Sequence, residues 1–228
     1  MLIIPVVDIK NGVVVHASGG NRSTYQPIES LLCSTSKPED VIRAMIKVTE
    51  KMNPAHLFYI ADLDAIESNG DNFQLISDLC LKFRGITFWI DAGFQSKEQL
   101  ENWKQIPNIQ PVIGSESHKD LGTLKYLLSS ETILSLDFRN GKLLGPKELL
   151  NRSDLWPEKI IVMALDAVGC GKGVAHDLIN LIRHQKLDNK IFAAGGVRSK
   201  ADLHQLEQTG IEGVLLATAL HTGKLAFH

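Results

Sequence analysis

The chain has 228 residues, of which 44% are hydrophobic and 22% are charged, a composition typical of a globular protein with one large domain or two small ones. Its net charge is −2 and its basic residues are scattered, which argues against a nucleic-acid or membrane partner and leaves a small molecule as the expected one. The three cysteines, Cys33, Cys80 and Cys170, form no C-x-x-C pair and have no histidines at metal-ligand spacing, so the sequence predicts a reduced, cytoplasmic protein without a metal site.

The first element is an apolar run of seven residues, which lacks the basic flank and the length of a signal peptide or membrane span and is expected to be a buried strand. Seven more short runs rich in β-branched residues follow, and segments with the helical period lie between them. The eight expected strands cover residues 2–7, 56–61, 86–90, 110–113, 132–136, 160–165, 190–194 and 213–216. This alternation is typical of repeated β-α units that form a parallel sheet.

Helix starts are marked by capping residues with acidic first turns, as at residues 36–40, 96–98 and 199–202. Eight β-α units in a chain of this length favour a closed (β/α)₈ TIM barrel, of the α/β class, over an open doubly wound sheet. No linker rich in Pro, Gly or Ser divides the sequence, so a single domain over residues 1–228 is predicted.

The second half of the chain repeats the first. The turn motif DIKNG at residues 8–12 matches DFRNG at residues 137–141, at a shift of 129 residues. At shifts of 102 or 103 residues, three further pairs match: 63–65 with 165–167, 92–100 with 195–203, and 114–118 with 217–221. Four matches in the same order, each at a strand end, predict two similar half-barrels, roughly residues 1–128 and 129–228.

Asp8 and Asp137 are the candidate catalytic residues, because each follows an apolar strand and therefore lies where barrel enzymes place their reacting groups. Two-fold symmetry between the halves would make the two carboxylates face each other across the barrel mouth. Opposed carboxylates suit general acid–base catalysis, since different surroundings can keep one protonated and the other ionised. The alternative is that each aspartate only caps the tight turn that follows it.

Two corners are candidate phosphate sites. Gly195 and Gly196 after the seventh strand, with Ala217 and Thr218 after the eighth, place backbone N–H groups where these barrels commonly bind phosphate. The glycines could instead serve only a tight turn. The first-half counterpart consists of Gly93, Gly114 and Ser115, but it has lost one glycine and gained Phe94. It could bind a second phosphate by the same geometry.

Five further residues are candidate substrate contacts. Arg22 and Tyr25 lie in a long loop after the first strand, and such loops in compact barrels are often functional, although a solvated arm is the alternative. Asp64 either positions substrate or caps the segment after the second strand. Asp166 precedes a glycine-rich stretch in which Lys172 could reach an anion, yet that stretch is neither a Walker motif nor a dinucleotide fingerprint.

The chain resembles the histidine-biosynthesis barrel family over essentially its whole length, in its paired Asp-x-(Lys/Arg)-Asn-Gly motifs, its Gly-Gly-Val corner and its half-barrel repeat. That family contains the phosphoribosylformimino-aminoimidazole carboxamide ribotide isomerase and the cyclase subunit of imidazole glycerol phosphate synthase. The resemblance implies a barrel of the ribulose-phosphate-binding type with a bis-phosphorylated substrate held at two symmetric phosphate sites. It also implies that Asp8 is the general base and Asp137 the general acid.

In the isomerase this pair performs an Amadori rearrangement of an aldose to a ketose, an intramolecular oxidoreduction that needs neither metal nor organic cofactor. The segment LSLD at residues 134–137 is especially like the isomerase. The resemblance therefore favours an isomerase acting on a phosphorylated sugar or phosphoribosyl compound. A lyase or cyclase with a partner, or a non-catalytic phosphate-binding barrel, are alternatives, and a glutaminase partner is not expected.

The sequence also departs from the family. Asp91-Ala92-Gly93-Phe94 stands where the isomerases carry a Gly-Gly-Gly segment after the third strand, and residues 166–171 differ from their Asp-Gly-Thr segment. The loop at residues 19–27 is also unlike theirs. These features resemble a divergent group found in methanogens and methylotrophs. They suggest a second hypothesis, a paralogue with another phosphorylated substrate in the biosynthesis of a one-carbon carrier such as methanopterin or methanofuran.

Overall fold

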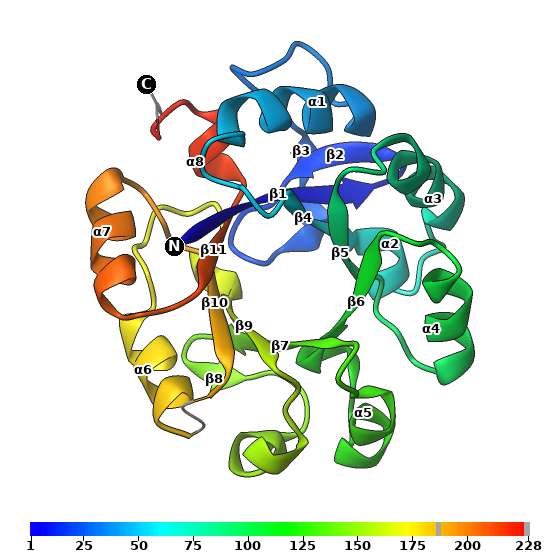
Figure 1. Cartoon of the computed structure of the whole chain (residues 1–228), viewed down its shortest axis with the longest axis vertical. Coiled ribbons are helices and arrows are strands. Elements are labelled where there is room, and N and C mark those ends of the chain that lie inside the picture. Colours follow the sequence, from blue (N-terminus) through cyan, green and yellow to red (C-terminus); the bar gives the residue numbers. More distant parts are fainter. Residues whose placement is uncertain (186–187, 226–228) are drawn as a thin grey trace.

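A computed structural model describes residues 1–185 and 188–225, and within these ranges eight parallel strands close into a ring. In ring order the strands are β1 (Leu2–Lys10), β4 (Leu57–Asp62), β5 (Thr87–Asp91), β6 (Ile109–Gly114), β7 (Ile133–Arg139), β9 (Lys159–Ala164), β10 (Lys190–Ala194) and β11 (Gly213–Leu216). Parallel pairing between β11 and β1 completes the ring. The fold is therefore the predicted (β/α)₈ barrel, with its helices arranged outside the strands (Figure 1).

The longer helices cover the outside of the barrel. They are α1 (Pro38–Thr49), α3 (Phe73–Lys82), α4 (Lys97–Lys104), α5 (Leu121–Leu127), α6 (His176–Gln185) and α7 (Lys200–Gln208). The expected caps at Ser96 and Ser199 are present, but α1 begins after Lys37 with Pro38 in its first turn, so Ser36 is not its cap. None of the helices in the described ranges combines the length and apolar character that a membrane crossing requires.

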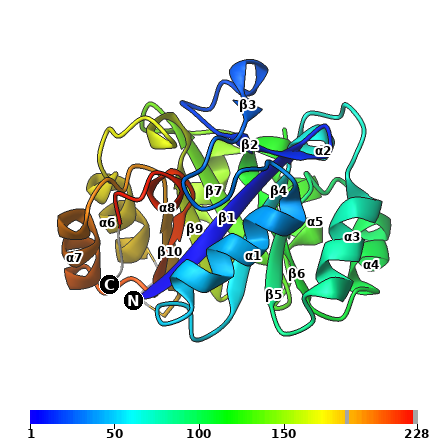
Figure 2. The same cartoon turned by 90° about the horizontal axis from the view of Figure 1, so that it is seen from above.

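The short elements lie in the loops. They are the helices α2 (Leu63–Ile66) and α8 (Thr218–His221), the strands β2 (Val13–His16), β3 (Gln26–Pro27) and β8 (Lys142–Leu143), and the 3₁₀ turns η1 (Arg22–Thr24), η2 (Ser115–Ser117), η3 (Lys147–Asn151), η4 (Ser153–Leu155) and η5 (Leu165–Ala167). Figure 2 shows the segment that contains β2 and β3 at the end of the barrel toward which β1 runs.

Two strands, β1 and β7, extend well beyond their predicted ends, whereas β4, β5 and β6 each extend by one residue. β1 and β7 were expected to stop at residues 7 and 136, but each continues past its aspartate and turns back into an antiparallel hairpin with β2 or β8. Both hairpins turn at an Asn-Gly pair with positive φ, 51° and 75° at Asn11 and Gly12, and 51° and 72° at Asn140 and Gly141. Such pairs favour two-residue hairpins because asparagine and glycine tolerate this conformation. The Asn-Gly signal was in the sequence, and its matching geometry in both halves supports the duplication, which stays a prediction.

The barrel interior is packed by side chains that alternate along each strand with those facing the helices. One buried cluster contains Ile4, Tyr59, Trp89, Ile133 and Phe192, and it lies on the face of the strands that continues into Asp8 and Asp137. Trp89 and Phe192 meet edge to face with ring centroids 4.8 Å apart. The interior is therefore filled below the mouth, which leaves the carboxyl ends of the strands as the place for a site.

Phe192→Ala tests this packing. Removing the ring leaves a cavity beside Trp89, so we expect a loss of about 3–5 kcal/mol in the free energy of unfolding measured by urea denaturation. Leu181→Ala is the control, because Leu181 is 46% exposed and its truncation should change stability by no more than about 0.5 kcal/mol. Equal losses in the two variants would contradict a packed barrel interior.

Candidate active site

A cavity opens at the carboxyl ends of the barrel strands and encloses about 870 Å³ of space, its open mouth included. Eight of the residues predicted from the sequence line it: Asp8, Arg22, Tyr25, Asp137, Gly195, Gly196, Ala217 and Thr218. Six others do not: Asp64, Gly93, Gly114, Ser115, Asp166 and Lys172. The tertiary structure thus brings together the predicted acid–base pair, the loop after β2 and the second-half corner.

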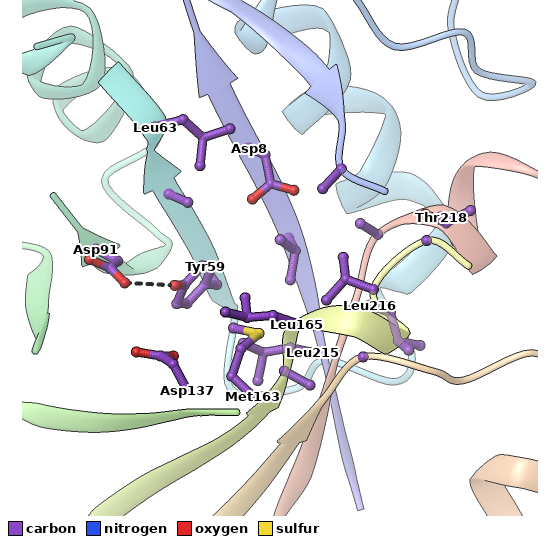
Figure 3. A pocket seen from close by; sticks show the side chains of 18 of the residues that line it. Asp8, Tyr59, Leu63, Asp91, Asp137, Met163, Leu165, Leu215, Leu216 and Thr218 are labelled. Carbon is purple, nitrogen blue, oxygen red and sulfur yellow. Dashed lines mark hydrogen bonds between the residues drawn. The ribbon is translucent and has the colours of Figure 1, made fainter. Parts of the chain in front are cut away.

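Asp8 and Asp137 face the cavity from opposite sides of the barrel. Four strand pairings separate β1 from β7 in either direction around the ring, as the predicted symmetry requires. Strand register places Asp8 beside Ala61, and Ala61 beside Asp91, while Asp137 pairs with Met163. Figure 3 shows Asp8, Asp91 and Asp137 around one end of the cavity. The strand pattern therefore points these three carboxyl groups into the same space.

Asp8 is the less constrained of the two predicted catalytic residues. Within the described part of the chain no group donates a hydrogen bond to its carboxylate, and its side chain is half-buried at the cavity wall. Burial away from water raises the pKa of Asp8 to about 7, which the nearby Arg22 opposes and Asp91 reinforces. A carboxyl group with this pKa can accept a proton near neutral pH.

Asp137 is held firmly. The hydroxyl of Ser135 donates to its Oδ1 at 2.6 Å, and the backbone N–H of Glu116 and the hydroxyl of Ser115 donate to its Oδ2 at 3.0 and 3.3 Å. Burial nevertheless raises the pKa of Asp137 to about 8, with further contributions from the charges of Glu116 and Asp91. Asp137 therefore keeps its proton to a higher pH than an ordinary aspartate does, which suits a general acid.

Asp91 is a third carboxyl group in the cavity, and the sequence analysis did not propose it as a site residue. It ends β5 and is 6% exposed, and its Oδ2 accepts a hydrogen bond from the Tyr59 hydroxyl at 3.2 Å. Burial raises its pKa to about 6, against the effect of the Gly93 N–H that donates to it at 3.1 Å. The signal that identified Asp8, an aspartate directly after an apolar run, was also present at Asp91.

Glu116 is the second residue that the sequence analysis missed. It follows β6 in η2 and lines the cavity, where both of its carboxylate oxygens pair with the guanidinium of Arg22. The loop that carries Arg22 is also held by Lys10, whose ammonium donates to the Arg22 carbonyl at 3.0 Å and pairs with Glu67 at 2.7 Å. The Arg22–Glu116 pair thus spans the mouth and joins the loop after β2 to the turn after β6.

The second-half corner keeps its glycines for a structural reason. Gly195 and Gly196 have φ values of 95° and 89°, and a Cβ at Gly196 would overlap the carbonyl oxygen of Gly173. Ala217 and Thr218 complete the corner, and the Thr218 hydroxyl lies 3.2 Å from Nε2 of His16. The backbone here passes close to the cavity without side chains between, as a phosphate site requires.

The first-half corner is built differently. A Cβ at Gly114 would lie 3.2 Å from carboxylate oxygens of both Asp91 and Asp137, so this glycine makes room for the two acids. Ser115 is buried, and its hydroxyl accepts a hydrogen bond from the Asp137 N–H. A Cβ at Gly93 would overlap the α-carbon of Ile66. In this structure the three residues support carboxyl groups of the protein, and their binding of a phosphate stays a prediction.

Asp64 and Asp166 have matching structural roles. Asp64 accepts a hydrogen bond from the backbone N–H of Asn11 at 2.7 Å, and Asp166 accepts one from that of Asn140 at 3.1 Å. Each carboxylate thus fastens the Asn-Gly turn of one hairpin. Lys172 lies 3.8 Å from Asp166 with its side chain exposed, outside the cavity wall. In this structure these residues lie around the mouth of the cavity and do not line the cavity itself.

Metal ligation is a separate question. Within residues 1–185 and 188–225, no three His, Cys, Asp or Glu side chains are arranged to hold a metal ion.

Comparison with known proteins adds the family. A family model described as histidine biosynthesis protein matches residues 2–226. The chain is 36% identical to an uncharacterized protein of Methanocaldococcus jannaschii, over 99% of this chain and 95% of the relative. It is 27% identical to the 1-(5-phosphoribosyl)-5-((5-phosphoribosylamino)methylideneamino) imidazole-4-carboxamide isomerase of Chlorobaculum tepidum, over 97% of this chain and 87% of the relative. Identity to the isomerase of the same name from Thermus thermophilus is 24%, over 99% and 96%.

The burial of Asp91 makes a prediction about stability. Its pKa of about 6 in the folded protein exceeds the ordinary 3.8, so the folded state binds the extra proton and the free energy of unfolding falls as pH rises between those values. Asp91→Asn cannot ionise, so between pH 4 and pH 7 we expect its stability relative to the original protein to improve by about 2–3 kcal/mol. Urea denaturation across this pH range measures the difference.

Asp78→Asn is the matched control for this measurement. Asp78 is exposed on α3, so its replacement should give no comparable gain with pH. A difference between Asp91→Asn and the original protein that stays constant from pH 4 to pH 7 would show that Asp91 is not desolvated.

Proposed function

The chain belongs to the histidine biosynthesis protein family, and from that premise we propose that it is an isomerase of a phosphorylated sugar or phosphoribosyl compound. The observation that carries the proposal is the pair of carboxyl groups on opposite strands of one cavity, Asp8 with a pKa of about 7 and Asp137 with a pKa of about 8. Because both pKa values are raised by burial, each group can exchange a proton near neutral pH.

The proposed reaction is an Amadori rearrangement of an aminoaldose. Asp137 donates its proton to the ring oxygen, so the bond between C1 and that oxygen breaks and a protonated imine forms between C1 and the nitrogen. Asp8 then removes the proton from C2. The electron pair of the broken C2–H bond forms a C1–C2 double bond, and the electron pair of the C1–N double bond moves to the nitrogen and neutralises it. Tautomerisation of the resulting enol returns a proton to C1 and leaves a ketone at C2, so the sugar is isomerised without net redox change.

The surroundings of Asp8 and Asp137 support the roles of base and acid, respectively. Asp8 accepts no hydrogen bond from the described residues and is half-buried at the cavity wall, so it can approach a C–H bond. Asp137 is fixed by the hydroxyls of Ser135 and Ser115, both of which can rotate to accept or donate as the carboxyl group changes its protonation state. The hydrogen bonding of the two groups therefore supports a fixed acid and a less constrained base.

The phosphate of the substrate is assigned to the second-half corner. Gly195, Gly196, Ala217 and Thr218 line the cavity there, and we expect a phosphate to bind to their backbone N–H groups. Tyr25 is a neutral hydrogen-bond donor, because burial raises its pKa to about 12, and Arg22 is the cation of the mouth. The loop that carries these two residues is therefore positioned to cover a bound sugar.

A second candidate is isomerisation of a different phosphorylated substrate, as the one-carbon carrier hypothesis requires. Two observations favour it: Asp91 occupies the segment where the sequence departs from the isomerases, and identity to the Methanocaldococcus jannaschii protein exceeds that to the named isomerases. In that case Asp8 and Asp137 would keep their roles, and the residues that contact the substrate would differ from those of the named isomerases.

Turnover of the histidine-pathway aminoaldose by Asp8→Asn and Asp137→Asn tests the leading function. Each substitution removes a proton acceptor or donor, so we expect kcat to fall by about 10²–10⁴-fold in either variant. Asp78→Asn, on the outer surface of α3, is the control and should keep full activity. No turnover by a folded original protein would sink the assignment of this substrate and leave the second candidate.

The pH profile tests the two roles. A base must be ionised and an acid protonated, so activity should fall below about pH 7 as Asp8 gains a proton and above about pH 8 as Asp137 loses one. We expect a narrow bell in kcat/KM with its maximum between these values. A profile that is flat from pH 6 to pH 9 would contradict the assignment of both groups.

A further inference from the structure

We propose that the substrate carries one phosphate, bound at the second-half corner, and that its other end presents hydroxyl or amine groups to Asp91 and Glu116. This inference rests on the proposed function. It differs from what the family resemblance implied, which was a substrate with a phosphate at each end. Asp91 is then the specificity-determining residue of the first-half end, and Tyr59 is the residue that positions it.

The donors that could bind a phosphate at the first-half corner are already in use. The N–H of Gly93 donates to Asp91 at 3.1 Å, and the N–H of Glu116 and the hydroxyl of Ser115 donate to Asp137. Two carboxylates of the protein thus occupy the positions that an external anion would need. A phosphate could bind there only by displacing them from groups that stabilise them.

Charge excludes a phosphate from the same end. Asp91 and Glu116 both line the cavity, and Asp8 and Asp137 lie beside them. Among the described residues that line the cavity Arg22 is the one cation, and its guanidinium is paired with Glu116. A phosphate dianion placed here would meet the negative charges of Asp91 and Glu116 in surroundings with little water, where like charges repel strongly.

The second-half corner differs from the first-half corner in its charge. The cavity wall at residues 194–197 and 215–219 contains no carboxylate, and the nearby Asp202 is turned away into an ion pair with Arg198 at 2.9 Å. Figure 3 shows Thr218 across the cavity from Asp91 and Asp137. One end of the cavity therefore accepts an anion and the other offers hydrogen-bond acceptors.

Geometry keeps Asp91 in place to select the substrate. The Tyr59 hydroxyl donates to its Oδ2, and the strand register of β4 and β5 sets the two side chains at the same end of the barrel. The following Phe94 is 2% exposed and packs edge to face against Trp103, which anchors the segment after β5. Carboxylate oxygens fixed in this way accept hydrogen bonds from hydroxyl or amine groups.

The test uses two ligands that differ only at this end: the histidine-pathway aminoaldose, with two phosphates, and the same molecule without the phosphate on its distal ribosyl group. Calorimetry measures the Kd of each, and turnover is followed in parallel. We expect the original protein to bind the monophosphate at least about tenfold more tightly. Binding of the bisphosphate as tightly as the monophosphate would overturn the inference.

Two variants at Asp91 separate charge from folding. Asp91→Asn keeps the shape and the acceptor for Tyr59, while Asp91→Gly restores the residue type of the related isomerases, so one variant remains informative if the other fails to fold. In both variants we expect the ratio of the bisphosphate Kd to the monophosphate Kd to fall by about tenfold. In Asp78→Asn we expect this ratio to stay the same. An unchanged ratio in both Asp91 variants would overturn the role of Asp91.

The outcomes distinguish this inference from the proposed function. Preferred binding of the monophosphate without turnover would refute the isomerase and keep the substrate class. Faster turnover of the bisphosphate would keep the isomerase and refute the single phosphate. Binding of neither ligand would refute both.

Discussion

The site depends on one constraint: closing eight strands into a barrel removes the carboxyl groups at its mouth from water. Burial is the largest cause of the raised pKa of Asp8, Asp91 and Asp137 alike, although each has different neighbours. The protein compensates unevenly. Asp137 receives three hydrogen bonds, Asp91 receives two, and Asp8 receives none from the described residues. This unequal hydrogen bonding makes three chemically identical groups different in freedom of movement, which supports the proposed acid–base roles.

The scaffold around these groups repeats in the two halves. Each proposed catalytic aspartate lies within a strand that runs on into a hairpin. Each hairpin turns at an Asn-Gly pair fastened by an aspartate from the neighbouring β-α loop, Asp64 in one half and Asp166 in the other. Those two aspartates were expected among the substrate contacts, which stays a prediction, and in the structure their carboxylates accept hydrogen bonds from the backbone N–H groups of the two turns. The mouth is therefore framed by the same device on both sides.

The two corners between these hairpins have diverged. The second-half corner keeps two adjacent glycines and a cavity wall without carboxylates, whereas the first-half corner encloses Asp91 and Asp137 around Gly114. A scaffold with similar halves thus holds an asymmetric cavity, with one end free of carboxylates in its wall and one acidic end. The Arg22–Glu116 pair crosses the acidic end and links the loop after β2 to it, so the state of the loop and the charge of this end are coupled.

The sequence by itself predicted the fold, which the structure confirms, because the fold depends on local patterns: the length and spacing of apolar runs and the period of the helices. The single domain and the acid–base roles of Asp8 and Asp137 stay predictions, although an aspartate at each strand end identified two residues that line the cavity. The sequence also held the Asn-Gly signals that the strand assignments at residues 7 and 136 overlooked. Only the tertiary structure decided which polar groups share the cavity. Asp137 bonds to residues about twenty positions earlier, and Arg22 pairs with Glu116 across 94 positions, so no local pattern encodes these contacts. Barrel closure creates them, and with them it decides which end of the mouth can accept an anion.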